Sequence, residues 1–276
     1  MPLVVALAAP AAAQQTFTGR LSDAKCGASH QSRAASDTDR QCVLACIKAL
    51  DKFVLVDRDQ KVIAIANQDA MGLPLYAGRP VRITGEMRGS AVFVAKVEAI
   101  PAHLHIGHVM TNWRDTPGAR GFLPVAVDEG VVALQHARLA AMSARLEDVQ
   151  LHAGHVLHAL DPGVEPKGPG AGYGVKKAVA GATQHLGFAV TAEGATADVA
   201  TQAPAVLALL ASVTQRVDQA IAMAQRVRSA TDMAAAASAA ADLVAMTERI
   251  TVDGLEPART HMNQLLKAEG LLGAPR

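Results

Sequence analysis

The second part of the chain is rich in imidazole side chains. Nine of the ten histidines lie after residue 100, and the stretch LHAGHVLHALDP (151–162) repeats histidine every third residue, at His152, His155 and His158. In a helix of 3.6 residues per turn, this spacing groups the three imidazoles on one arc, and the aliphatic residues fall on the opposite arc. Since neutral imidazole is a common ligand of Zn, Cu, Ni and Fe, the stretch predicts a metal- or haem-binding role.

Further histidines lie on other predicted elements. His105 and His108 belong to HLHIGHVMTNW (103–113), and His136 and His185 flank the apolar stripes of two other helices. Adjacent helices meet at such stripe edges, so imidazoles from several helices are expected to converge, as ligands do in bundle cores. A solvated histidine face is the alternative. No C-x-x-C-H motif is present, which excludes covalent c-type haem but leaves haem b with two axial imidazoles.

Carboxylates near these histidines could complete a mixed site for Zn, Cu, Ni or Fe, namely those of Asp128, Glu129 and Asp148. The Glu-x-x-His pattern of di-iron bundles is missing from the predicted helices. No G-x-S-x-G elbow or other catalytic spacing assigns acid, base or nucleophile. The sequence therefore favours a binding protein over an enzyme.

A second candidate cluster lies in the first third of the chain and comprises Cys26, His30, Cys42 and Cys46. Cys26 could form a disulfide with either other cysteine and staple a long loop, leaving one thiol spare. Alternatively, three thiolates and one imidazole could hold a tetrahedral metal, either zinc or Cu(I). The sequence leaves both arrangements open.

Residues 16–100 read as β structure. Alternating or apolar runs at 16–23, 53–57, 61–67, 80–87 and 91–100 predict five short strands. A helical pattern at 37–50 follows the first strand and carries an Asp/Thr N-cap signal. Five strands with one helix fit a small closed barrel of the OB kind.

Residues 101–276 read as helices. One helix is expected over 128–149, with Val131, Val132, Leu139, Met142, Leu146 and Val149 on its apolar face. A 4-3-4-3 seam of apolar residues runs from Val206 to Val227, which is typical of close helix packing. We expect a four- or five-helix bundle, and the domain boundary near residue 100. The glycine-rich segment 161–174 fits no phosphate-binding motif and is expected to be a structural loop.

The segments TGRLSDAKCGASH, CVLAC, KFVLVD and IANQDAMGLPLYAGRPVRITGEM within 16–100 carry a resemblance. Together they resemble an exported bacterial domain family of unknown function. That family shows G-x-[IL]-S-D-x-x-C-G-x-x-H, then C-x3-C, and later A-G-x-x-V-x-[IV]-T-G. Its motif positions are occupied here by Gly19, Ser22, Asp23, Cys26, Gly27, His30, Cys42 and Cys46. The resemblance implies the small β fold and export, and no mechanism.

Composition and charge narrow the function classes. The chain has 276 residues, a net charge of +1 and 3% aromatic residues, so no basic field or stacking platform points to nucleic acid. Residues 1–13 look like the remnant of a signal peptide, which implies a periplasmic or secreted protein. No later apolar run is long enough for a membrane span. We expect an exported protein that binds Cu, Zn or haem b, or else a disulfide-stapled envelope scaffold with a protein partner or a homo-oligomeric state.

Overall fold

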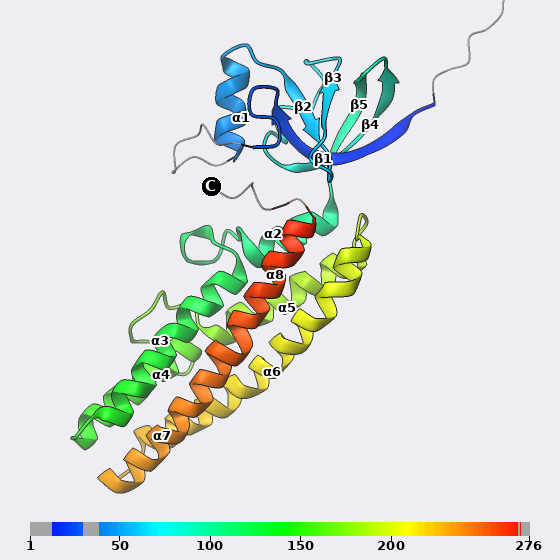
Figure 1. The fold of residues 1–276 in the computed structure, drawn as a ribbon. Helices are drawn as coiled ribbons and strands as arrows, with labels where there is room; N and C mark the ends of the chain where they lie inside the picture. The colour runs from blue at the N-terminus through cyan, green and yellow to red at the C-terminus, as the bar shows by residue number, and fades with distance from the viewer. Residues whose placement is uncertain (1–12, 30–38, 270, 272–276) are drawn as a thin grey trace, which may run out of the picture. The chain divides into compact units, whose positions relative to one another are not determined.

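The computed structural model describes residues 13–29, 39–269 and 271. The chain divides into two compact units, one that takes in the chain up to Ile100 together with Glu269, and one that spans Pro101–Ala268. Each unit has its own hydrophobic core. The first unit holds the β structure and the second is helical (Figure 1).

The first unit is a sheet of five strands with one helix. In chain order its elements are β1 (Gln15–Asp23), α1 (Asp39–Lys48), β2 (Phe53–Val56), β3 (Val62–Ile65), β4 (Pro80–Arg88) and β5 (Ala91–Ala99). The strands pair in the closed order β1-β2-β3-β5-β4, since β4 also pairs with β1. All pairs are antiparallel except β3 with β5. The five expected strands and the expected helix are confirmed.

Two glycines allow the strands to curve into this small ring. A Cβ atom at Gly19 would lie 2.4 Å from the Val56 carbonyl oxygen, and one at Gly85 would lie 2.4 Å from the Phe93 carbonyl oxygen. A register shift next to Gly85 interrupts the β4–β5 ladder. Glycine inside a strand commonly marks such a bend or close approach.

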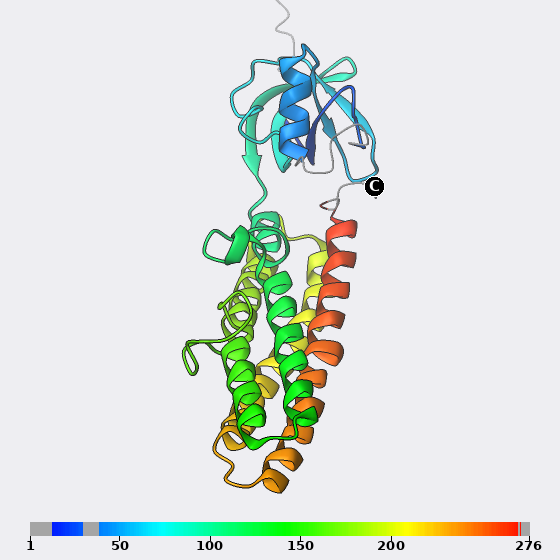
Figure 2. The ribbon, with the colours of Figure 1, turned by 90° about the vertical axis from the view of Figure 1, so that its left-hand side faces the viewer.

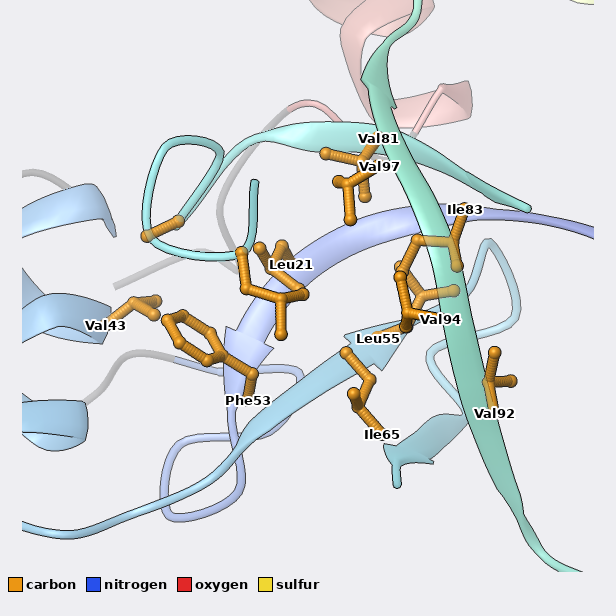
Figure 3. Packing of buried hydrophobic residues seen from close by; sticks show 12 residues of the cluster. Leu21, Val43, Phe53, Leu55, Ile65, Val81, Ile83, Val92, Val94 and Val97 are labelled. Carbon is orange, nitrogen blue, oxygen red and sulfur yellow. The ribbon is translucent and has the colours of Figure 1, made fainter. Parts of the chain in front are cut away.

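Alternate residues of the strands fill the interior of the ring (Figure 3). Leu21, Leu55 and Ile83 are fully buried there. Val43 of α1 points towards Phe53, so the helix covers one opening of the ring (Figure 3). This packing fixes α1 next to the end of β1, which brings the cysteines together.

The second unit contains seven α-helices among the described residues. They are α2 (Pro101–Met110), α3 (Phe122–Met142), α4 (Leu146–Leu160), α5 (Val175–Thr191), α6 (Ala197–Arg228), α7 (Met233–Ile250) and α8 (Glu256–Ala268). A short 3-10 turn, η1 (Pro117–Ala119), precedes α3, and a π-helical turn, η2 (Thr251–Leu255), joins α7 to α8. The longer helices run side by side (Figure 2). The expected count of four or five helices is too low, since the described residues of this unit form seven.

The predicted seam of α6 is confirmed, with Val206, Leu210, Val213 and Val217 fully buried. Helix α6 packs against α4, α5, α7 and α8. Among the described residues it is the one helix long and apolar enough to cross a membrane, a criterion of length and composition that core helices also meet.

The expected single helix over 128–149 is confirmed only as far as Met142. The chain turns at 143–145 between α3 and α4, and Val131, Leu139 and Met142 are exposed. From Gly130 onward the buried face of α3 consists largely of small residues, such as Ala133 and Ala137. Close helix packing favoured this face over the larger apolar side chains, which a hydrophobicity pattern ranks higher.

Candidate metal-binding sites

The first histidine cluster joins α2 to α5. His105 and His108 lie three residues apart, on neighbouring positions of one face of α2, and His185 comes from α5, which packs against α2. The Nδ1 atom of His185 lies 3.1 Å from that of His105 and 3.2 Å from that of His108. We call this trio the α2–α5 site.

Aromatic rings enclose the α2–α5 site. The His108 and Trp113 ring centroids are 4.7 Å apart, and Phe122 stacks on His185 at 5.4 Å. A Cβ atom at Gly181 would lie 2.4 Å from the Phe122 ring, so this glycine of α5 lets Phe122 reach its place under His185. His185 is buried and the other two imidazoles are partly buried.

The second cluster joins α3 to α4 and repeats the same arrangement. His152 and His155 lie three residues apart on α4, and His136 comes from the packed helix α3. The Nδ1 atom of His136 lies 3.1 Å from that of His152 and 3.3 Å from that of His155. All three imidazoles are partly buried. We call this trio the α3–α4 site.

Burial favours the neutral form of an imidazole, which is the form that binds metals. Loss of hydration lowers the pKa of His105, His108, His155 and His185. The pKa of His136 falls to about 4, first through burial and then through repulsion from the neighbouring His155 and His152. Burial therefore favours the metal-binding form of these five imidazoles.

The nitrogen positions favour a shared cation over hydrogen bonding alone. A neutral imidazole has a single N–H, so one Nδ1 hydrogen cannot make two linear hydrogen bonds to two other Nδ1 atoms. With Zn–N bonds of about 2.0–2.1 Å, two ligands at a tetrahedral angle lie about 3.3 Å apart. The observed separations of 3.1–3.3 Å match this value. Three protein ligands would leave a fourth position open at each site.

A third cluster lies in the first unit, where Asp23, Cys26, Cys42 and Cys46 bring their donor atoms within 4.8 Å of one another. All three cysteines are free here, and the Sγ atoms of Cys26 and Cys42 lie 3.8 Å apart, so the disulfide alternative stays a prediction. His30 lies outside the described residues. Asp23, which the sequence analysis placed only at a motif position, occupies the cluster.

Several candidates do not join a cluster. The Nδ1 atom of His158 contacts the Glu165 carbonyl oxygen at 2.8 Å, and its ring packs under Gly168. The structure groups His155 with His152 and does not group His158 with another candidate ligand, because the His158 ring contacts Glu165 instead. Its contact holds the loop at 161–174 in place.

The three candidate carboxylates also serve elsewhere. Asp128 pairs with Arg120 at 2.5 Å, and Asp148 lies 4.0 Å from Arg145. Glu129 is buried, and its Oε1 accepts the N–H groups of Tyr173 and Gly174. The glycine-rich loop thus donates to a carboxylate of the chain itself, which accords with its expected structural role.

Comparisons with protein-family models, with curated proteins and with solved structures found no match. The resemblance of residues 16–100 to an exported bacterial family therefore stays a prediction.

Proposed function

We propose that the helical unit binds two transition-metal ions, one at the α2–α5 site and one at the α3–α4 site. The observation that carries the proposal is the repeated geometry of the two trios, in which a pair of histidines spaced i,i+3 meets one histidine of a packed helix. Histidines that are buried independently of one another would not be expected to form two separate clusters with the same Nδ1 spacing.

The chemistry of the trios favours a bare ion over haem b. Axial imidazoles of a haem lie on opposite faces of the macrocycle, whereas the three Nδ1 atoms of each trio converge on one point. Imidazole ligands suit Zn, Cu and Ni, and affinity rises towards Cu(II) in the Irving–Williams order. The proposed ion is therefore Zn(II) or Cu(II), and the proposed role is metal handling without catalysis.

The proposal includes an OB-like assignment for the first unit and an exported location. The closed strand order with its parallel β3–β5 pair supports the assignment, although the helix here follows β1. Export rests on the resemblance of residues 16–100 and on residues 1–13, of which 1–12 lie outside the described residues. Neither point is needed for the metal sites.

The test is the zinc content of the full chain after equilibrium dialysis. His136→Ala and His185→Ala should each bind one ion fewer than the unmodified protein, and the double variant two fewer. His261→Gln, a change at a partly buried histidine of α8 outside both trios, should bind the full number. If the double variant keeps the full number of ions, the helical unit is not a metal site. The alternative function, an envelope scaffold protein, is then favoured.

A further inference from the structure

The cysteine cluster of the first unit is built from three successive pieces of chain. Asp23 ends β1, Cys26 lies in the turn that follows, and Cys42 and Cys46 lie one turn apart in α1. Asp23 is fully buried, Cys42 is buried, and the other two are partly buried. None of these residues belongs to the helical unit, so a metal site formed by them does not depend on the histidine sites.

The sulfur separation suits two thiolates on one ion. The Sγ atoms of Cys26 and Cys42 are 3.8 Å apart. A disulfide bond is about 2.05 Å long, whereas two Zn–S bonds of about 2.3 Å at a tetrahedral angle place the sulfurs about 3.8 Å apart. The observed distance thus matches shared coordination.

The Asp23 carboxylate supplies a second and independent observation. Its Oδ1 accepts the Cys26 N–H at 2.9 Å, while its Oδ2 is buried with no hydrogen-bond partner. A buried carboxylate oxygen without a donor is costly, and a bound cation is one way to satisfy it. This oxygen belongs to the same group of donor atoms as the three sulfurs.

The backbone around Cys26 is fixed independently of any ion. The Ser22 hydroxyl donates to the Gly27 carbonyl oxygen at 2.7 Å, and Gly27 N–H donates to the Asp23 carbonyl oxygen at 2.8 Å. Arg20 donates to the Ala28 carbonyl oxygen at 3.0 Å. Gly27 has φ +55°, a left-handed conformation that glycine adopts without strain. The turn therefore presents Cys26 to α1 in a preset position.

The thiol environment argues against a reactive cysteine pair. Burial, with the nearby Asp23 and Cys26, raises the pKa of Cys42 to about 11 and that of Cys46 to about 12. Catalytic and redox-active thiols instead have a lowered pKa. A divalent cation in the cluster would displace the thiol protons and offset part of the negative charge of the three thiolates and the Asp23 carboxylate.

We propose that Asp23, Cys26, Cys42 and Cys46 form a tetrahedral site of three sulfurs and one oxygen for Zn(II) or an ion of its class. The oxygen ligand selects this class over Cu(I), which soft thiolates alone suit. The site ties β1 to α1 and is closed, with four protein ligands, in contrast to the open histidine sites.

The test uses Co(II) as a spectroscopic substitute for Zn(II) in the reduced full-length protein. Thiolate ligands give Co(II) intense near-ultraviolet charge-transfer bands, which imidazole sites lack, so the histidine sites do not obscure the signal. The proposal expects such a band to saturate at one equivalent and to be displaced by Zn(II). It expects Cys42→Ser to abolish it and His261→Gln, a change outside both histidine trios, to leave it unchanged. Absence of the band from the unmodified protein, or thiolate binding of Cu(I) alone, would overturn the proposal.

The fourth ligand is tested by a matched pair of variants. Asp23→Asn should weaken Co(II) binding more than tenfold, while Asp69→Asn, at an exposed carboxylate of the same unit, should not change it. His30 is the other candidate for the fourth ligand, and His30→Ala tests it. If His30→Ala abolishes the band and Asp23→Asn does not, Asp23 is not a ligand. Near-ultraviolet circular dichroism checks that each variant is folded, and X-ray absorption of the Cd(II)-loaded unmodified protein reports the sulfur ligands without any substitution.

Discussion

The α2–α5 and α3–α4 sites share their ligand set and differ in what surrounds it. In the α2–α5 site the imidazoles are packed among the rings of Trp113, Phe122 and Phe188. The α3–α4 site instead adjoins a cavity of about 270 Å³, whose wall includes His155, Lys167 and Arg228. The ligand set decides whether an ion binds, and the surroundings decide how easily solvent, chelators and other ligands reach it. The two sites should therefore have similar ligand chemistry and different accessibility.

The largest expected effect is the independent loss of each site. His185→Ala removes the imidazole that lies nearest to both partners in the α2–α5 site, and His136→Ala does the same in the α3–α4 site. Each change should weaken zinc binding at its own site by more than 100-fold and leave the other site unchanged. Competition titrations against a chromophoric chelator measure both. Simultaneous loss of both sites in either single variant would contradict their independence.

The single tryptophan distinguishes the sites directly. Trp113 lies with its ring centroid 4.7 Å from that of His108 and 4.8 Å from that of His185. Cu(II) bound at the α2–α5 site should quench most of the tryptophan fluorescence, because bound Cu(II) quenches a nearby indole. The quenching should persist in His136→Ala and disappear in His185→Ala. Equal quenching in both variants would mean that the copper binds elsewhere.

A smaller effect is expected in the rate of metal removal. The cavity gives a chelator access to the α3–α4 site, whereas aromatic rings pack around the other site. In stopped-flow chelation, zinc should leave in two phases, and the rate constant of the fast phase should be about tenfold larger than that of the slow phase. The fast phase belongs to the α3–α4 site and should be absent from His136→Ala. A single phase, or a fast phase lost in His185→Ala, would reverse the assignment of accessibility.

The smallest effect is the pH dependence of the metal-free protein. The folded-state pKa of His136 is about 4, while the unfolded chain has the ordinary value of 6.5. As the pH falls from 6.5 to 4, the unfolded chain takes up a proton that the folded protein resists, so the free energy of unfolding decreases. The melting temperature of chelator-treated protein should fall across this window, and less steeply in His136→Gln. A melting temperature that is constant between pH 7 and 4 would show that His136 titrates normally.

The helices and strands could be predicted from the sequence. The residues that make up each site could be predicted only in part. Period-two alternation and the polar turns located all five strands, and the seam of α6 located its buried face. The two H-x-x-H pairs, at His105 and His152, were visible as candidate ligands. Which third imidazole each pair meets depends on which helices pack together, and no single stretch of sequence contains that information.

The failures have physical causes. From Gly130 onward the buried face of α3 is made largely of small residues such as Ala137, which carry little hydrophobic signal although they allow close packing. His158 continues the three-residue repeat, but its ring binds the Glu165 carbonyl oxygen instead. Asp23 stands only three residues before Cys26, and its spacing with the cysteines could have suggested a fourth ligand.

The most direct test of the two histidine sites is anomalous diffraction from crystals of the zinc-loaded protein, recorded on both sides of the zinc absorption edge. The account predicts one anomalous peak in each trio, about 2.0–2.1 Å from the three Nδ1 atoms. The peaks should lie between His105, His108 and His185 and between His136, His152 and His155. Fully loaded crystals with no peak in either trio would contradict the account.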